Sequence, residues 1–341
     1  MVEPRRIKKA GGAGRITRKK APPAALLSII APIFNELDNL PDLHRRVRAV
    51  MQATRLDWEL LLVDDGSTDG STEAIQALAR ADAHIRPILF ARNFGHQIAV
   101  TAGLDYARGQ AVVIIDADLQ DPPELIPDLV AKWRQGFEVV YAVRAEREGE
   151  TWFKRLTAAI FYRVIFRITD VKIPLDVGDF RLLDRQVVDT LNRMRERHRF
   201  LRGMSAWVGF RQVGVPYRRA ARTAGATKYP FRKMLRLAIN AVTGFSYFPL
   251  QLATYFGFVS AGLSALAIPV VVVMRLIGHQ AFVGQATTLI AVLFLGGVQL
   301  ISLGILGEYI GRLYDEAKGR PLYVAREAPP KDEVVPAGGR R

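Results

Sequence analysis

The sequence predicts an α/β domain with a mostly parallel sheet, followed by two helices that span a membrane. Three observations support this fold class. Short apolar runs alternate with helical patterns through the first part of the chain, as in sheets that carry helices on both faces. Polar clusters follow several of these runs. Two long segments near the C-terminus, residues 250–274 and 281–307, contain no charged residue.

The alternating part of the chain runs from residue 26 to residue 143. Its short apolar runs predict buried strands at residues 26–31, 60–63, 85–90, 111–115 and 139–143. The segments between them predict helices at residues 36–54, 71–81 and 97–107. In such sheets ligands bind beyond the carboxyl ends of the strands, so the polar clusters found there are candidate site residues.

The two apolar segments are long enough to cross a bilayer. They contain 25 and 27 residues, and a hydrocarbon core needs about 20 in a helix. Their length and tandem placement argue against core helices of a soluble protein. The turn between them carries one Arg and one His, whereas the flanking regions are far more basic. The rule that positive charge stays inside therefore predicts that both termini and the α/β domain lie in the cytoplasm, with the protein anchored in the inner membrane.

The net charge of +15 calls for a polyanionic partner, which could be nucleic acid, anionic lipid or a phosphorylated substrate. Residues 1–24 carry eight Lys/Arg against one acid, Glu3, and predict a disordered basic tail. Residues 197–236 carry eleven Lys/Arg and no acid. Residues 324–341, rich in Pro and Gly, predict a flexible tail. The absence of cysteine excludes disulfides, thiolate metal sites and cysteine nucleophiles.

Two basic segments have the pattern of helices that lie in a membrane interface. Residues 229–246 place Arg232, Arg236 and Asn240 on one face and run directly into the first apolar segment, which favours a juxtamembrane amphipathic helix. Residues 151–168 mix basic and aromatic side chains. There the interfacial helix and an ordinary helix packed on the sheet are both open.

Asp116 and Asp118 follow the fourth predicted strand directly. Two carboxylates at i and i+2 of a strand end point to the same side and repel each other unless a cation lies between them. Such hard oxygen ligands suit Mg²⁺ or Mn²⁺, with a substrate diphosphate completing the coordination shell. Gln120 and Asp121 beside them strengthen the prediction of a metal site.

The acidic cluster of residues 64–69 follows the second strand. Asp65 could accept hydrogen bonds from a sugar or base while a neighbour caps the next helix. Glu36, after the first strand, is equally compatible with a first-turn helix charge and with a ligand contact. The P-loop, G-x-G-x-x-G, C-x-x-C and H-E-x-x-H signatures are all absent.

Taken together, the motifs resemble those of inverting family-two glycosyltransferases. They are S-I-I-A-P-I-F-N-E (28–36), L-L-V-D-D-G-S-T-D (61–69), R-N-F-G-H (92–96) and D-A-D-L-Q-D-P-P-E (116–124). D-V-G-D-F-R-L-L-D-R (176–185), R-T-A-G-A-T-K-Y (222–229) and the two apolar segments narrow the resemblance to polyprenyl-phosphate glycosyltransferases. That group includes bactoprenol glucosyltransferases, aminoarabinose-lipid transferases and dolichyl-phosphate mannose synthases. The likeness covers about residues 26–315; Thr227 stands where relatives usually have serine, and it keeps the hydroxyl.

The resemblance implies a Rossmann-like GT-A nucleotide-sugar domain over residues 25–228. It implies that Pro32, Glu36 and Asp65 hold the nucleoside and that Asp116 contacts the donor. Arg144, at the end of a strand, would face the leaving diphosphate.

The resemblance also implies the catalytic and phosphate-binding residues. Asp118 and Gln120 would bind Mg²⁺ or Mn²⁺ under the diphosphate, and Asp118 is counted with the catalytic residues for that reason. Asp179 would lie by the anomeric carbon, with Arg181 orienting it as a further catalytic residue. Phosphates of the donor or the lipid would be neutralised by Arg222 and Lys228.

The expected reaction is a single inverting displacement that moves a sugar, with glucose from UDP-glucose as the first expectation, onto undecaprenyl or another polyprenyl phosphate. Asp179 would act either as a base or as a positioning group. A processive polysaccharide synthase is an alternative, but its Q-x-x-R-W motif is absent. A non-catalytic membrane scaffold would not need the acidic constellation. The basic residues lie next to the spans without a nucleic-acid-binding signature, so the bilayer is the expected polyanionic partner. The oligomeric state, including a homo-oligomer, is left open.

Overall fold

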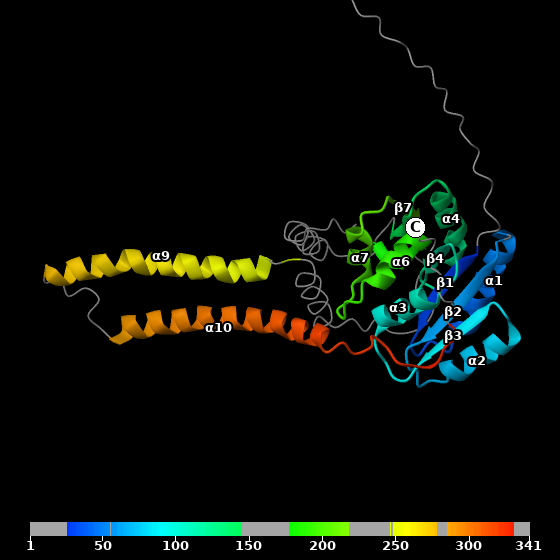
Figure 1. Cartoon of the computed structure of the whole chain (residues 1–341), viewed down its shortest axis with the longest axis horizontal. Coiled ribbons are helices and arrows are strands. Elements are labelled where there is room, and N and C mark those ends of the chain that lie inside the picture. The colour runs from blue at the N-terminus through cyan, green and yellow to red at the C-terminus, as the bar shows by residue number, and fades with distance from the viewer. Residues whose placement is uncertain are drawn as a thin grey trace, which may run out of the picture.

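The computed structural model describes residues 26–54, 56–144, 177–217, 246, 248–277 and 285–330. Figure 1 shows an α/β domain from which two long helices extend side by side. The predicted tail at residues 1–24 and interfacial helix at residues 151–168 lie outside the described residues, as does all but Ser246 of the juxtamembrane helix predicted at residues 229–246.

Within the described residues, the domain has one eight-stranded sheet in the order β7-β5-β6-β4-β1-β2-β3-β8. The strands are β1 Leu27–Ile33, β2 Trp58–Asp64, β3 Ile85–Phe90, β4 Ala111–Ile114, β5 Val139–Arg144, β6 Val177–Asp184, β7 Gln212–Tyr217 and β8 Ala325–Glu327. β1 pairs in parallel with β2 and β4, and β2 pairs in parallel with β3. The mostly parallel α/β sheet expected from the sequence is confirmed.

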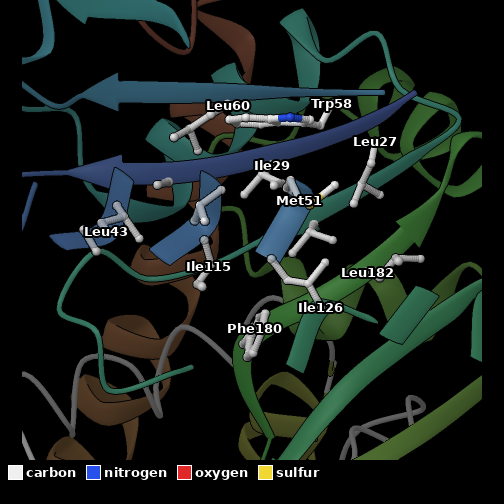
Figure 2. Packing of buried hydrophobic residues seen from close by; sticks show 14 of the residues in the cluster. Leu27, Ile29, Leu43, Met51, Trp58, Leu60, Ile115, Ile126, Phe180 and Leu182 are labelled. Carbon is white, nitrogen blue, oxygen red and sulfur yellow. The ribbon is translucent and has the colours of Figure 1, made fainter. Parts of the chain in front are cut away.

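Helices cover both faces of this sheet because each buries an apolar stripe. They are α1 Leu40–Thr54, α2 Ser71–Ala81, α3 His96–Tyr106, η1 Pro123–Leu125, α4 Ile126–Arg134, α6 Arg185–Arg193 and α7 Leu201–Trp207. One apolar cluster joins α1, α2 and α4 to the sheet, and a second joins α3, α6 and α7. Figure 2 shows Leu43 and Met51 of α1 and Ile126 of α4 beside strand residues of the first cluster. Each such side chain contributes roughly 1.5–3 kcal/mol when it is fully buried.

Two strands depart from the parallel pattern. β6 lies between β4 and β5 and is antiparallel to both. β8 is antiparallel to β3 at the outer edge. The sequence-based expectation of a flexible tail from residue 324 is therefore wrong at its start: the N–H of Ala91 donates to the carbonyl of Val324 (2.9 Å). β3 otherwise presents unpaired backbone groups at this edge, and β8 satisfies them. Residues 331–341 lie outside the described residues.

The two long helices are α9 Phe248–Leu276 and α10 Gln285–Ala317. Both contain segments long and apolar enough to cross a membrane, with mean hydropathy of 2.2 and 1.8, and neither segment is buried. Large apolar side chains such as Phe258 and Leu300 are 74% and 70% exposed. A water-soluble core helix would hide these side chains, so this apolar surface fits a lipid environment. The first predicted span lies within α9, and α10 continues ten residues beyond the second, from 307 to Ala317.

Candidate active site

The loops that follow β1 and β2 are hydrogen-bonded to each other. Asn35, whose φ is 56°, accepts the N–H of Thr68 (2.8 Å) and donates its own N–H to Ser67 Oγ (3.0 Å). Pro32 lies at the end of β1, opposite Val63 of β2. These contacts hold two of the candidate nucleotide-binding loops at the same edge of the sheet.

Glu36 belongs to a turn that precedes α1. Its carbonyl accepts the N–H groups of Asn39 and Leu40, and its carboxylate accepts a hydrogen bond from the Asn39 amide (2.5 Å). The N–H of Glu36 donates to Ser71 Oγ at the start of α2 (3.2 Å). The predicted helix from residue 36 therefore begins at Leu40, because this turn takes its first four residues.

The Asp65 carboxylate holds a neighbouring loop. It is buried and accepts the N–H groups of Phe94 (2.6 Å) and Gly95 (2.9 Å). Burial raises the pKa of Asp65, against the effect of these two hydrogen bonds. At Gly66, with φ of 73°, a Cβ atom would lie 2.6 Å from the backbone carbon of Arg92. Asp65 and Gly66 thus fix the loop of residues 92–95 that leads to His96.

Asp116 and Asp118 lie in the loop after β4, as the sequence predicts. Asp118 Oδ1 accepts the N–H of Gln120 (3.2 Å), which turns the loop back toward the carboxylates. Asp116 Oδ1 is buried and has no hydrogen-bond partner among the described residues. Burial, together with the neighbouring carboxylates of Asp179, Asp121 and Asp118, raises the pKa of Asp116 to about 6 against the opposing effect of His96. Burial and the nearby negative charges therefore destabilise the ionised form of Asp116.

Asp179, on β6, is surrounded by donors. Arg202 of α7 donates from Nε to Oδ1 (2.8 Å) and from Nη2 to Oδ2 (3.2 Å). Gln97 Nε2 donates to Oδ2 (3.4 Å), and His96 Nε2 lies 3.3 Å from the same oxygen. Burial opposes ionisation, but Arg202 and His96 outweigh it and hold the pKa of Asp179 well below its usual range. Asp179 is therefore a carboxylate at neutral pH.

His96 lies between the two acidic groups. Its Nε2 is 3.6 Å from Asp116 Oδ1 and 3.3 Å from Asp179 Oδ2, and its side chain is 41% exposed. Desolvation works to lower the pKa of His96, but the two carboxylates outweigh it and raise the pKa. The imidazole links the loop after β3 to both acids.

Arg181, which the resemblance implies would orient Asp179, contacts the backbone of that residue. It is 3% exposed and donates to Ser205 Oγ (2.5 Å), to the Gly178 carbonyl (3.0 Å) and to the Asp179 carbonyl (3.3 Å). Burial lowers the pKa of Arg181 to about 10. Its guanidinium braces the backbone of β6 from inside the domain. The basic side chains at the Asp179 carboxylate are His96 and Arg202, to which the sequence analysis assigned no role.

Arg144 ends β5 beside Tyr217 of β7. Its Nη2 lies 3.3 Å from where a Cβ of Gly178 would stand, so the guanidinium packs closely against the backbone at the start of β6. Tyr217 donates its hydroxyl proton to the buried Asp121, and burial together with Asp121 raises the pKa of Tyr217 to about 12. Arg222 and Lys228, the predicted phosphate ligands, lie outside the described residues.

The acidic loop fits a divalent cation by its chemistry. No group of three or more His, Asp or Glu side chains among the described residues is arranged to hold a metal ion. Yet the buried, unpartnered oxygen of Asp116 and the repulsion among its acidic neighbours are what a cation would relieve. The donor set is of the hard oxygen type that Mg²⁺ and Mn²⁺ prefer.

Comparison with known proteins identifies the class of this chain. Residues 28–191 match glycosyl transferase family 2, and residues 248–313 match the GtrB C-terminal hairpin. An uncharacterized glycosyltransferase of Bacillus subtilis (strain 168) is 48% identical over 301 residues, which cover 88% of this chain and 93% of the relative. The chain belongs to glycosyl transferase family 2. The present chain is also 41% identical, over 302 residues, to the bactoprenol glucosyl transferase of Shigella phage SfII. The alignment covers 89% of this chain and 98% of the phage protein.

The family match and the relatives confirm the enzyme class expected from the motifs. Among solved structures, a mannosyltransferase from Pyrobaculum calidifontis in complex with GDP-Man and Mn²⁺ aligns with 83% of this chain and 86% of its own, at 17% identity and a TM-score of 0.42. The hairpin match coincides with the exposed apolar helices α9 and α10, which associate this glycosyltransferase with a membrane.

Proposed function

We propose that this glycosyltransferase transfers glucose from UDP-glucose to undecaprenyl phosphate or another polyprenyl phosphate, at the cytoplasmic face of the membrane. The observation that carries the proposal is the joining of an acidic site, at Asp116 and Asp179, to an exposed apolar hairpin in one chain. Relatives that align with 89% and 88% of this chain are named bactoprenol glucosyl transferases. A polyprenyl phosphate stays in the bilayer, so its transferase must work at the interface.

The donor would bind at the carboxyl ends of β1, β2 and β4. Pro32, Glu36 and Asp65 belong to the loops that we assign to the nucleoside, with Asp65 acting through the loop it holds. Asp116, Asp118 and Gln120 would hold Mg²⁺ or Mn²⁺ under the diphosphate. When bound, the ion stabilises the negative charge that builds on the departing nucleoside diphosphate.

Cationic side chains complete the proposed phosphate sites. Arg144, at the end of β5, would face the leaving diphosphate. Arg222 and Lys228 would neutralise phosphates of donor or lipid. Fixed charges of this kind lower the barrier because they require no reorganisation during the reaction.

Asp179 is best suited to hold the sugar. A phosphate monoester is largely ionised at neutral pH, with a second pKa of about 6, so the acceptor oxygen needs little help from a base. The pKa of Asp179 is held far below its usual range, which makes this carboxylate a weak proton acceptor. We therefore assign Asp179 to positioning the sugar and stabilising positive charge at the anomeric carbon during an inverting displacement.

The proposal is tested by transfer of radiolabel from a panel of nucleotide-sugars into organic-extractable lipid, with purified full-length protein, undecaprenyl phosphate and Mg²⁺ or Mn²⁺. We expect label from UDP-glucose, lost in EDTA and in Asp118→Ala. Asp128→Ala, which removes an exposed acid of α4, is the matched control and should retain activity. Label from a different sugar would correct the donor only. Label in an insoluble polymer would indicate a processive synthase, and no label from any donor would refute the proposal.

A further inference from the structure

The chain returns to the catalytic domain after its second apolar helix. Residues 315–327, which we call the C-terminal strap, comprise the end of α10, the connecting segment and β8. Figure 1 shows this orange-to-red segment leaving α10 and running along the domain to the edge of the sheet at β3. Two of the strap's contacts with the domain lie just before a residue that contacts Asp179.

The first contact is with the segment that leads into α7. Glu316 Oε1 accepts the N–H of Arg197 (2.7 Å), and the Arg197 guanidinium donates to the carbonyl of Arg320. Asp315 Oδ2 lies 3.4 Å from His198 Nε2. α7 begins at Leu201, just after this segment. Its second residue is Arg202, which donates one hydrogen bond to each carboxylate oxygen of Asp179.

The second contact is with the end of β3. The Tyr323 ring stacks on Phe90, with centroids 5.2 Å apart and planes at 16°, and its hydroxyl donates to Asp105 Oδ2 (2.8 Å). Phe90 in turn meets the edge of Phe94, with centroids 5.5 Å apart. Phe94 belongs to the loop fixed by Asp65, and that loop ends at His96.

Gln97 joins the two places. Its Oε1 accepts the N–H of Leu201 (3.0 Å), and its Nε2 donates to Asp179 Oδ2 (3.4 Å). Gln97, the second residue of α3, therefore connects the start of α3 to the start of α7 beside the Asp179 carboxylate. The segments that lead into these two helices each contact the strap. Displacement of a reacting group by about 1 Å, even by a change far from the chemistry, can cost about 100-fold in rate.

We propose that the C-terminal strap positions two side chains that contact Asp179, Arg202 through Glu316 and His96 through Tyr323, and so couples membrane anchorage to assembly of the active site. Glu316 and Tyr323 are positioning residues. The inference rests on the proposed function, because Asp179 must act in the transfer for its position to matter. A strap that only covered the edge of β3 would affect stability and solubility but not kcat.

The test measures steady-state transfer of glucose to undecaprenyl phosphate by full-length variants, together with equilibrium binding of UDP and thermal unfolding. In Glu316→Ala and Tyr323→Ala we expect kcat to fall about tenfold or more, with the donor KM and UDP affinity within about twofold of wild type. Glu316→Gln keeps an acceptor oxygen for the Arg197 N–H and should recover most of kcat. Tyr323→Phe keeps the ring stack and should give an intermediate value.

The matched control is Glu308→Ala, an acid on α10 that pairs with Arg312 of the same helix and should leave kcat unchanged. Double-mutant cycles identify the route of the effect. If Glu316 acts through Arg202, Glu316→Ala should cost little in an Arg202→Gln background, and Tyr323→Ala should likewise cost little in a His96→Asn background.

The outcomes separate the two proposals. A wild-type protein that transfers no sugar would refute the proposed function itself. An active wild type with normal kcat in the Glu316→Ala and Tyr323→Ala variants would overturn the role of the strap, as would additive losses in the cycles. A fall in kcat matched by equal losses of UDP binding and melting temperature would also overturn it. Glu316 is exposed, so its alanine variant keeps the test decisive even if Tyr323→Ala unfolds.

Discussion

Asp116 and Asp179 contact the same histidine, yet their pKa values move in opposite directions. Both side chains are largely desolvated, which alone would raise both pKa values. Arg202 reaches both oxygens of Asp179, whereas Asp116 Oδ1 has no hydrogen-bond partner among the described residues. The negative charge of Asp179 is therefore balanced by side chains of the protein, whereas the charge of Asp116 is the one that a bound cation would stabilise.

The first prediction concerns Asp179→Asn. A general base contributes about 10²–10⁴ in rate, so its loss would cost that much. Asparagine keeps the shape and the sugar contact, and the acceptor phosphate is already ionised, so we expect kcat to fall only about tenfold. Initial rates at saturating UDP-glucose would measure this, with Asp128→Asn as the control. A loss near 10⁴-fold would restore the role of a base.

At the scale of elements, the site depends on close packing between helices and the sheet. α3 carries His96 at its first residue and lies against β1, where a Cβ at Gly103 would be 2.3 Å from Ile30 Cγ2. On the opposite side of the sheet, Asp82 joins α1 to the turn before β3 by binding His44 (2.9 Å) and His84 (2.7 Å). The small size of Gly103 thus sets the distance between α3 and β1, and the Asp82 carboxylate connects α1 to the turn before β3.

The second prediction concerns Gly103→Ala. Alanine is the better helix former by about 1 kcal/mol, but its methyl group would collide with Ile30 in the core. We expect a net loss of about 1–3 kcal/mol in the free energy of unfolding, because an overpacked core must shift its backbone. Urea unfolding of the full-length protein in detergent would measure it. Unchanged or increased stability would show that α3 can move away from β1 without cost.

The third prediction concerns pH. Burial opposes ionisation of Asp82, but the hydrogen bonds from His44 and His84 outweigh it and lower its pKa well below the ordinary value. The unfolded state then takes up the proton first, so the stabilisation is present above pH of about 4 and is lost as pH falls through the folded-state pKa. We expect Asp82→Asn to be less stable than wild type at pH 7 and the difference to shrink below pH of about 4. Urea midpoints across this range would test it, and a difference independent of pH would contradict it.

At the scale of the whole molecule, contacts of the C-terminal strap join the end of the apolar hairpin to the catalytic domain. The chain enters α9 from the domain, and after α10 the C-terminal strap closes the far edge of the sheet. The Tyr309 hydroxyl also donates to the carbonyl of Ser246, just before α9 (2.8 Å). This bond ties α10 to the start of α9, and the C-terminal strap ties the end of α10 to the domain.

The fourth prediction compares two truncations. A chain ended after Pro330 retains β8 and should transfer sugar at the wild-type rate. A chain ended after Gly319 loses Tyr323 and β8, and we expect a lower kcat together with aggregation through the exposed edge of β3. Transfer assays and size-exclusion chromatography in detergent would measure both effects. Equal kcat in the two chains would contradict the prediction.

Much of the fold could be predicted because its determinants are local. Apolar runs marked β1 to β5 within a few residues, and the acidic pair after β4 was recognisable from its place at a strand end. The β6 strand was missed because its pairing with β4 and β5 depends on distant residues. The start of the predicted tail was wrong because residues 325–327 become a strand only when the edge of β3 is available.

The sequence by itself determined the α/β class, the two apolar helices, the family resemblance and the acids Asp116, Asp118 and Asp179. These follow from periodicity, length and motifs, which are properties of neighbouring residues. Only the tertiary structure decided which cation serves which acid. Arg181 stands two residues from Asp179 on β6 and so shares its face of the sheet, but its buried guanidinium donates to Ser205 and to backbone carbonyls. Arg202 and His96 come from distant elements and reach Asp179 because strand pairing and helix packing bring their loops to one edge of the sheet.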